Sequence, residues 1–248
     1  MANWRCKNAE GQELRYFLGV AWVPDLFSEP VDLMGVRIHP GYLDRVAQDS
    51  LVHDLRGVAS HAPFQRYETP GGRKLSVRMT AAGARGWMTD RSGYRYSEER
   101  PGGGRWPEIP DSVLRVWREL SGVTRDPDSC LVNFYGEGAR MGLHQDRDET
   151  DLTWPVVSIS LGDDALFRVG GVDKPAPSKS QWLKSGDVAV IAGEARLAYH
   201  GIDRIKFRSS DLLPEGGRIN LTLRVAGSGC SNRSQVPSCC YCRSGPGA

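Results

Sequence analysis

The sequence of 248 residues has no hydrophobic run of transmembrane length. Its most apolar early stretch, residues 16–23, is short, contains a glycine and follows Glu10 and Glu13 rather than a basic segment. A secretory signal carries a basic segment before its apolar core, so this stretch does not match one. We therefore expect no membrane anchor and a cytoplasmic protein.

Cysteine is also scarce over most of the chain. Of the six cysteines, Cys6 and Cys130 are isolated, and the other four lie within residues 230–248. This distribution excludes the disulfide framework of a small secreted fold. We expect a disordered tail at residues 228–248, where Ser, Gly and Cys predominate. A soft-metal site in this tail is the less favoured alternative, because its cysteines lack a complete ligand set with finger-like spacing.

The overall charge is small, but it is unevenly distributed. The formal net charge of +2 does not by itself indicate a polyanionic partner. Residues 56–105, however, hold ten arginines and lysines against four acidic residues. Such a local excess of positive charge attracts phosphate groups regardless of base sequence. The aromatic residues that interleave with these charges are Tyr67, Trp87, Tyr94 and Tyr96.

The overall composition, with 40% hydrophobic and 25% charged residues, is typical of one globular domain. Residues 1–30 have no periodic pattern and stay unassigned. Apolar spacing predicts helices at residues 43–58 and 113–120, and several short apolar segments predict strands. We expect a mainly β fold with flanking helices (α+β), of the jelly-roll type. The expected strands are residues 131–135, 156–161, 165–169, 188–192 and 219–225.

A short motif, His144-Gln145-Asp146, is the first sign of a metal site. On a strand, residues i and i+2 share a face, so His144 and Asp146 would reach one ion. Alone this motif is weak, and a surface hydrogen-bonded pair explains it better. His200, at the end of a strand-like segment that begins at Gly186, completes a set of two histidines and one carboxylate. Such a set leaves three positions open on non-haem iron(II), with catalytic zinc as the competing metal.

Residues 218–225 alternate strictly between polar and apolar side chains. In isolation, an ordinary half-buried strand with a solvated polar face explains this pattern. If the polar face instead lies inside a barrel, Arg218 and Arg224 need anionic partners, because an unpaired buried charge is costly. A dicarboxylate co-substrate is such a partner.

Several motifs in a characteristic order make the sequence resemble the bacterial AlkB family of dioxygenases, over residues 56–227. The downstream motifs are Asn133-Phe134-Tyr135, His144-Gln145-Asp146-Arg147-Asp148-Glu149, residues 157–162, Gly193-Glu194-Ala195-Arg196, Tyr199-His200-Gly201 and residues 218–224. The upstream motifs are Thr69-Pro70-Gly71-Gly72, Met79-Thr80, Gly86-Trp87 and Gly93-Tyr94-Arg95-Tyr96.

This resemblance implies a double-stranded β-helix (jelly roll) within residues 31–227, with a nucleotide-recognition segment at residues 56–105. It also implies iron(II) as the metal, with 2-oxoglutarate and O2 as co-substrates. The implied metal ligands, which are also the catalytic residues, are His144, Asp146 and His200. The implied 2-oxoglutarate-binding residues are Asn133, Tyr135, Arg218, Asn220 and Arg224.

The reaction that the resemblance implies is the oxidative removal of N-methyl groups from bases of the 1-methyladenine and 3-methylcytosine type. It releases formaldehyde, succinate and CO2. We therefore expect direct-reversal repair of alkylated single- or double-stranded DNA by a monomeric enzyme. RNA is the alternative substrate.

The same resemblance suggests how the base is bound. Trp87 resembles the family's stacking residue, with His144 on the other side of the flipped base, and an indole face attracts a cationic base. Asp148 would accept a hydrogen bond from the exocyclic amine, and Tyr94 resembles a phosphate contact. Without the resemblance, a core aromatic and a turn residue explain Trp87 and Tyr94 better. Lys174 stands in place of a family arginine and makes a less directional contact. The remaining substrate-binding residues are Thr69, Met79 and Glu149.

Two other functions are weighed against demethylation. A dioxygenase acting on a protein or a small metabolite would keep the metal and 2-oxoglutarate residues, but would have no use for a basic, aromatic segment ahead of the barrel. A non-catalytic nucleic-acid-binding module on an inactive dioxygenase fold would need neither the complete metal set nor both arginines. We favour the demethylase because all of these features are present.

Overall fold

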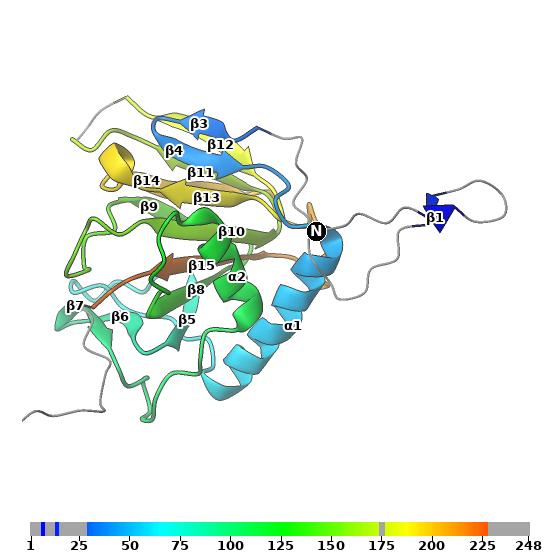
Figure 1. Cartoon of the computed structure of the whole chain (residues 1–248). Helices are drawn as coiled ribbons and strands as arrows, with labels where there is room; N and C mark the ends of the chain where they lie inside the picture. Colours follow the sequence, from blue (N-terminus) through cyan, green and yellow to red (C-terminus); the bar gives the residue numbers. More distant parts are fainter. Residues whose placement is uncertain (1–5, 8–12, 15–28, 174–176, 228–248) are drawn as a thin grey trace, which may run out of the picture.

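The structure, a computed structural model, describes residues 6–7, 13–14, 29–173 and 177–227. The predicted disordered tail and nearly all of the unassigned N-terminal extension lie outside the described residues. Near the N-terminus, the two-residue strands β1 (Cys6–Lys7) and β2 (Glu13–Leu14) pair with each other. The other elements form two antiparallel sheets, a hairpin, two α-helices and one short 3-10 helix (Figure 1).

The larger sheet has seven strands in the order β3-β4-β13-β10-β15-β8-β5, all antiparallel. Its central strands are rich in valine, isoleucine and leucine and are buried on both faces. Four of the five predicted strands fall here, each within two residues of its observed bounds. The strands are β3 (Val31–Leu33), β4 (Val36–His39), β5 (Arg78–Gly83), β8 (Ser129–Tyr135), β10 (Val156–Gly162), β13 (Val188–Ile191) and β15 (Arg218–Arg224).

The smaller sheet has four strands in the order β12-β11-β14-β9 and packs against the inner face of the larger one. Phe167 and Ile202 of the smaller sheet join Leu131 and Ile191 of the larger sheet in one buried apolar cluster. Two antiparallel sheets packed in this way form the expected sandwich. The strands are β9 (Met141–His144), β11 (Ala165–Val169), β12 (Lys179–Leu183) and β14 (His200–Ile205).

Helices α1 (Arg45–His61) and α2 (Asp111–Leu120) cover the outer face of the larger sheet (Figure 1). Leu55 of α1 and Trp117 of α2 belong to the same buried cluster as Ile159 and Leu221 of the sheet. Neither described helix is long and apolar enough to cross a membrane. Since the helices close the outer face, the inner face is left to build the site.

Helix α1 begins later than its sequence pattern predicts. Asp44 takes the N-cap position, and its carboxylate accepts a hydrogen bond from the backbone nitrogen of Ala47 at 2.8 Å, so Leu43 lies before the helix. Val46, a member of the predicted apolar pattern, is 69% exposed, whereas the later members of the pattern are buried. Leu43, which lies before the cap, and the members from Leu51 onward therefore face the core, whereas Val46 does not.

Residues 56–105, the expected nucleotide-recognition segment, contain a hairpin that the sequence pattern did not indicate. Strands β6 (Gly86–Asp90) and β7 (Gly93–Ser97) pair with each other, and β6 contacts β5 and β8 (Figure 1). Gly86 lies so close to Trp106 that a Cβ atom there would be 2.3 Å from the indole ring. Glycine at this position therefore lets the ring of Trp106 pack directly against the hairpin.

Candidate metal and co-substrate site

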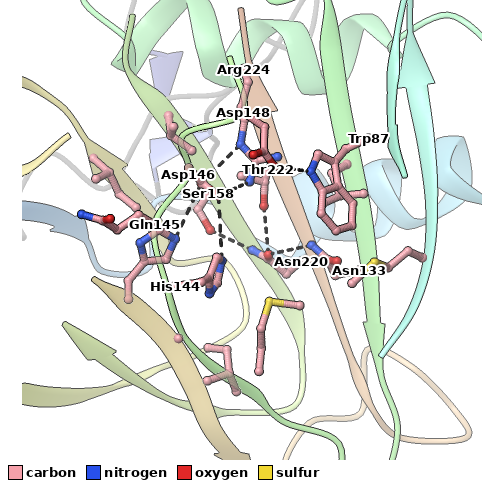
Figure 2. A pocket seen from close by; sticks show the side chains of 18 of the residues that line it. Trp87, Asn133, His144, Gln145, Asp146, Asp148, Ser158, Asn220, Thr222 and Arg224 are labelled. Atoms are coloured by element: carbon pink, nitrogen blue, oxygen red, sulfur yellow. Dashed lines mark hydrogen bonds and ion pairs between the residues drawn. The ribbon is translucent and has the colours of Figure 1, made fainter. Parts of the chain in front are cut away.

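A cavity of about 420 Å³ lies between the two sheets and is bounded by the hairpin β6–β7 (Figure 2). The polar residues of the alternating strand β15 all line it, and all four are buried. The alternative of a solvated polar face on this strand is therefore wrong. These residues are Arg218, Asn220, Thr222 and Arg224.

The three predicted metal ligands meet at one point of this cavity. One potential ligand atom from each of His144, Asp146 and His200 lies within 4.8 Å of the other two. The Nε2 atoms of His144 and His200 lie 3.8 Å and 3.6 Å from the carboxylate oxygens of Asp146. Their Nδ1 atoms lie 2.9 Å from the carbonyl oxygens of Gly142 and Ala198. Because a carbonyl only accepts, each Nδ1 carries the proton and each Nε2 is free to bind a metal.

The charge states of these residues suit a divalent cation. Burial, with His144 nearby, lowers the pKa of His200 to about 4, so this imidazole is neutral near pH 7. Burial alone would raise the pKa of Asp146, but Arg224 and the two histidines lower it below its ordinary value, so the carboxyl stays ionised. Neutral imidazole and ionised carboxylate are the forms that bind metal. Among the described residues, this is the one group of three or more such ligands close enough to share an ion.

The structure corrects the way in which the sequence placed these ligands. His144 is the last residue of β9 and Asp146 lies in the following loop, so a shared strand face does not bring them together. His200 begins β14, because the short helix η1 (Gly193–Ala195) interrupts the strand-like segment that starts at Gly186. The two histidines are instead opposite each other on the neighbouring antiparallel strands β9 and β14.

Two buried arginines hold Asp146 in its loop. Arg224 donates to both carboxylate oxygens of Asp146, at 2.8 Å and 3.2 Å. Arg196, the residue after η1, donates to the backbone carbonyl of Asp146 at 2.6 Å and to Glu149 at 3.0 Å. The role of Arg196 was not predicted, although the residue belongs to a family motif. Nothing in its sequence neighbours distinguishes a buried arginine from an exposed one.

Arg218 makes the other part of the cavity suitable for a dicarboxylate. Its side chain is fully buried, and Nη2 donates to the hydroxyl of Ser160 at 3.0 Å. Its Nε and Nη1 atoms have no hydrogen-bond partner among the described residues. Burial lowers the pKa of this guanidinium, which has no carboxylate partner in the described part of the chain. Desolvated guanidinium donors bind a carboxylate in a fork geometry, so the residues present fit 2-oxoglutarate.

The other predicted co-substrate residues lie on the same wall. Asn133 and Asn220 are opposite each other on β8 and β15 (Figure 2). The Oδ1 atom of Asn133 is buried and has no hydrogen-bond partner in the part of the chain that the structure describes. The ring of Tyr135 packs under the guanidinium of Arg218, 5.2 Å from its centre to the guanidinium carbon. Arg224 also lines the cavity, but it already binds two carboxylates, so its contact with the co-substrate stays a prediction.

Two aromatic residues of the hairpin lie at the same cavity. The rings of Trp87 and Tyr94 are stacked, with centroids 5.7 Å apart and planes 22° from parallel. The indole Nε1 of Trp87 donates to the carboxylate of Asp148 at 2.8 Å (Figure 2). Tyr94 is 53% exposed and lies within strand β7 rather than in a turn. Trp87 is half-buried at the edge of the apolar cluster, where it lines the cavity.

The remaining predicted substrate residues are placed differently from one another. Met79 is buried in β5 and lines the cavity. Glu149 also lines it, but its carboxylate is held by two arginines. Thr69 is not among the lining residues; its hydroxyl accepts a hydrogen bond from the backbone of Arg73 in a surface turn. Lys174 lies outside the described residues.

Comparisons with known proteins place this geometry in a family. Residues 35–224 match the model of the 2OG-Fe(II) oxygenase superfamily. The alpha-ketoglutarate-dependent dioxygenase AlkB homolog of Caulobacter vibrioides (strain NA1000 / CB15N) is 52% identical over 81% of this chain and 92% of its own length. The alpha-ketoglutarate-dependent dioxygenase AlkB of Escherichia coli (strain K12) is 43% identical over 73% of this chain and 86% of its own. The solved structure of OsALKBH1 matches with a TM-score of 0.63 and 32% identity, over 77% of this chain and 97% of that one.

These matches agree with the fold and with the chemistry of the cavity. The structural match confirms the expected mainly β, jelly-roll architecture. The family match favours iron(II) over zinc for the His–Asp–His set, and 2-oxoglutarate as the dicarboxylate of the cavity. The chain therefore belongs to the AlkB family within the 2OG-Fe(II) oxygenase superfamily, and is an Fe(II)- and 2-oxoglutarate-dependent dioxygenase.

Proposed function

We propose that this dioxygenase removes methyl groups from N-alkylated nucleic-acid bases of the 1-methyladenine and 3-methylcytosine type. DNA is the expected substrate and RNA the alternative. The observation that carries the proposal is the hydrogen-bonded pair of Trp87 and Asp148, which lines the same cavity as the metal ligands. A methylated base of this type is a planar cation with an exocyclic amine, and the pair offers a partner to each feature.

Stacking and charge both favour such a base over a neutral one. The indole face of Trp87 attracts a planar cation, and the carboxylate of Asp148 is exposed and accepts hydrogen bonds from an amine. Asp148 is two residues from the metal ligand Asp146, so a base held by this carboxylate lies near the metal. A base whose pairing edge is blocked by a methyl group is also cheaper to extrude from a duplex.

Exposed basic side chains in and around the recognition segment supply attraction to phosphates. Arg73, Lys74 and Arg91 are exposed. Arg95 contributes less, because it pairs with Asp90 at 2.6 Å. Electrostatic attraction of this kind raises affinity for any nucleic acid, and the base contacts then provide selectivity.

The chain positions reactants while the bound groups supply the oxidation. When bound, iron(II) and 2-oxoglutarate would supply the O2-dependent oxidation whose products are succinate, CO2 and formaldehyde. His144, Asp146 and His200 would hold the metal, and Arg218 would hold a carboxylate of the co-substrate.

A hydroxylase of a protein or a small metabolite is the second candidate, because it would use the same metal and co-substrate residues. The stacked pair of Trp87 and Tyr94 favours a nucleobase over either of these. The two bacterial relatives that carry the AlkB name support the same choice.

The deciding experiment measures formaldehyde and succinate from the purified protein with iron(II), ascorbate and 2-oxoglutarate. We expect formaldehyde with oligonucleotides that contain 1-methyladenine or 3-methylcytosine, matched by an equal increase of succinate above the base-independent level, and neither increase with unmethylated controls. Parallel single-stranded DNA, duplex DNA and RNA substrates rank the nucleic acids. Succinate without any formaldehyde from every methylated oligonucleotide would refute the proposal.

The organisation of the enzyme completes the proposal. We expect residues 31–227 to form the catalytic unit, with residues 56–105 as its nucleotide-recognition segment. We also expect a cytoplasmic monomer that repairs DNA by direct reversal. Size-exclusion chromatography with light scattering of the full chain tests the oligomeric state.

A further inference from the structure

Glu149 is buried although its neighbour Asp148 is exposed; the side chain of Glu149 is 2% exposed. Its carboxylate lies 3.0 Å from Nη2 of Arg196 and 3.3 Å from Nε of Arg224. It also accepts a hydrogen bond from the hydroxyl of Tyr96 at 2.6 Å. One carboxylate therefore joins the end of η1, strand β15 and strand β7.

The two arginines that share Glu149 are the same two that hold Asp146. Arg224 binds the carboxylate of Asp146, and Arg196 binds its backbone carbonyl. Arg196 also donates to the carbonyl of Trp154 at 2.7 Å, so it fastens both ends of the loop from residue 146 to residue 154. The position of Asp146 thus depends on where these guanidiniums are fixed.

The charges of this buried group balance. Arg196 and Arg224 carry two positive charges, and Asp146 and Glu149 carry two negative ones. Without the charge of Glu149, the two guanidiniums would share a single buried carboxylate, that of Asp146. Breaking a buried pair leaves an uncompensated charge, which would draw the Asp146 carboxylate toward the arginines and away from a metal.

We propose that Glu149 is a positioning residue of the metal centre, which fixes Arg196 and Arg224 so that Asp146 presents its carboxylate to the metal. This role replaces the base contact that the family resemblance suggested for Glu149. Through Tyr96, the same carboxylate ties the metal-binding loop to the nucleotide-recognition segment. The inference rests on Asp146 as a metal ligand and is independent of which base is the substrate.

Mn(II) binding to the full chain tests this role without turnover, with the electron paramagnetic resonance signal of free Mn(II) as the readout. Glu149→Gln keeps the shape of the side chain and removes its charge. Loss of a group that orients metal ligands weakens metal binding by about 10–100-fold, and we expect Glu149→Gln to fall in this range. Glu137→Gln makes the same change at an exposed position outside the cavity and should bind Mn(II) as the wild type does.

A contact with the base predicts the opposite pattern. If Glu149→Gln keeps its Mn(II) affinity but binds a methylated oligonucleotide more weakly, the proposal is overturned. Circular dichroism checks that each variant folds. If Glu149→Gln does not fold, Arg196→Lys provides a second test. It keeps the charge but loses the fork that reaches two backbone carbonyls, so it should also weaken Mn(II) binding, and unchanged affinity would overturn the proposal.

The Asp146→Ala variant separates this inference from the proposed function. It should abolish Mn(II) binding while the fold survives. Retained binding in Asp146→Ala would remove the metal assignment itself. Loss of binding there, combined with wild-type affinity in Glu149→Gln, would leave the metal site intact and refute the positioning role alone.

Discussion

Replacing Arg218 with methionine should stabilise the protein free of metal and co-substrate, and at the same time remove its binding of 2-oxoglutarate. The guanidinium of Arg218 is buried, and its Nε and Nη1 atoms have no hydrogen-bond partner among the described residues. A buried cation in this state destabilises the fold until an anion arrives. Methionine has a flexible apolar side chain of suitable length and carries no such penalty.

The magnitude follows from the partners of the guanidinium. Each unsatisfied buried donor costs about 1–3 kcal/mol. Arg218→Met removes two of these and also loses the bond to Ser160, so a net stabilisation of about 1–3 kcal/mol remains. Since 1 kcal/mol shifts the Tm of a domain of this size by about 2–4 °C, the Tm of the variant should rise by about 5 °C.

Binding of 2-oxoglutarate should stabilise the wild type but not the Arg218→Met variant. A ligand at one hundred times its Kd stabilises the folded state by about 2.7 kcal/mol, which corresponds to roughly 5–10 °C. We therefore expect 2-oxoglutarate, added with Mn(II), to raise the Tm of the wild type by this amount and to leave Arg218→Met unchanged.

Thermal melting with increasing 2-oxoglutarate measures both effects in one titration. Arg115→Met, a change of the same chemistry on the exposed face of α2, should alter neither the starting Tm nor the response. An Arg218→Met variant that responds to 2-oxoglutarate as the wild type does would show that Arg218 does not hold the co-substrate. A lower starting Tm would show that the buried donors are satisfied in the free protein.

Three further outcomes are expected from the same site. Trp87→Ala should weaken binding of methylated oligonucleotides by about 1–3 kcal/mol in a fluorescence-anisotropy titration, the range for base–aromatic stacking, and should leave base-independent 2-oxoglutarate decarboxylation nearly unchanged; loss of Mn(II) binding together with a large drop in Tm would mark Trp87 as a core residue instead. Tyr94→Phe keeps the ring and removes a hydroxyl, so in that titration it should weaken the binding of methylated and unmethylated oligonucleotides equally. An effect that depends on the methylated base would contradict a phosphate contact. Burial lowers the pKa of His200 from 6.5 to about 4, so on acidification the unfolded chain binds a proton at this residue before the folded chain does. The urea midpoint of the metal-free protein should therefore decrease as the pH is lowered from about 6.5 to about 4, and His200→Asn should flatten this dependence.

The fold was predictable where a strand carries a regular apolar run or a strict polar–apolar alternation in its sequence. Strands β10 and β15 are buried on both faces, and their apolar runs or strict alternation are visible in the sequence. Strand β9 (Met141–His144) is short and lacks both signals, and the hairpin β6–β7 is polar and half exposed. Their pairing depends on contacts between distant segments, which no local pattern records.

The site was predictable in its residue types but not in its supports. His144, Asp146 and His200 were identified by kind and by family order, and the structure brings them together. The assumption that a strand face joins His144 to Asp146 was wrong, because a loop and two arginines do this instead. Whether an acidic residue such as Glu149 is buried or exposed depends on tertiary packing, so its partners could not be inferred from the chain alone.

Because His144 and His200 are opposite each other on β9 and β14, metal binding depends on the register in which these two strands pair. Side chains alternate between faces along a strand, so a slip of one residue between β9 and β14 would turn one imidazole away from the other. Strand β9 is an edge strand with one neighbour, and Gly201 packs so closely against it that a Cβ atom would lie 2.6 Å from the carbonyl oxygen of Met141. Molecules that misalign here during refolding would keep a native circular dichroism spectrum and yet take up no iron. The ratio of bound metal to protein therefore detects misaligned molecules in refolded or mutant preparations, which circular dichroism of the backbone would not distinguish from native protein.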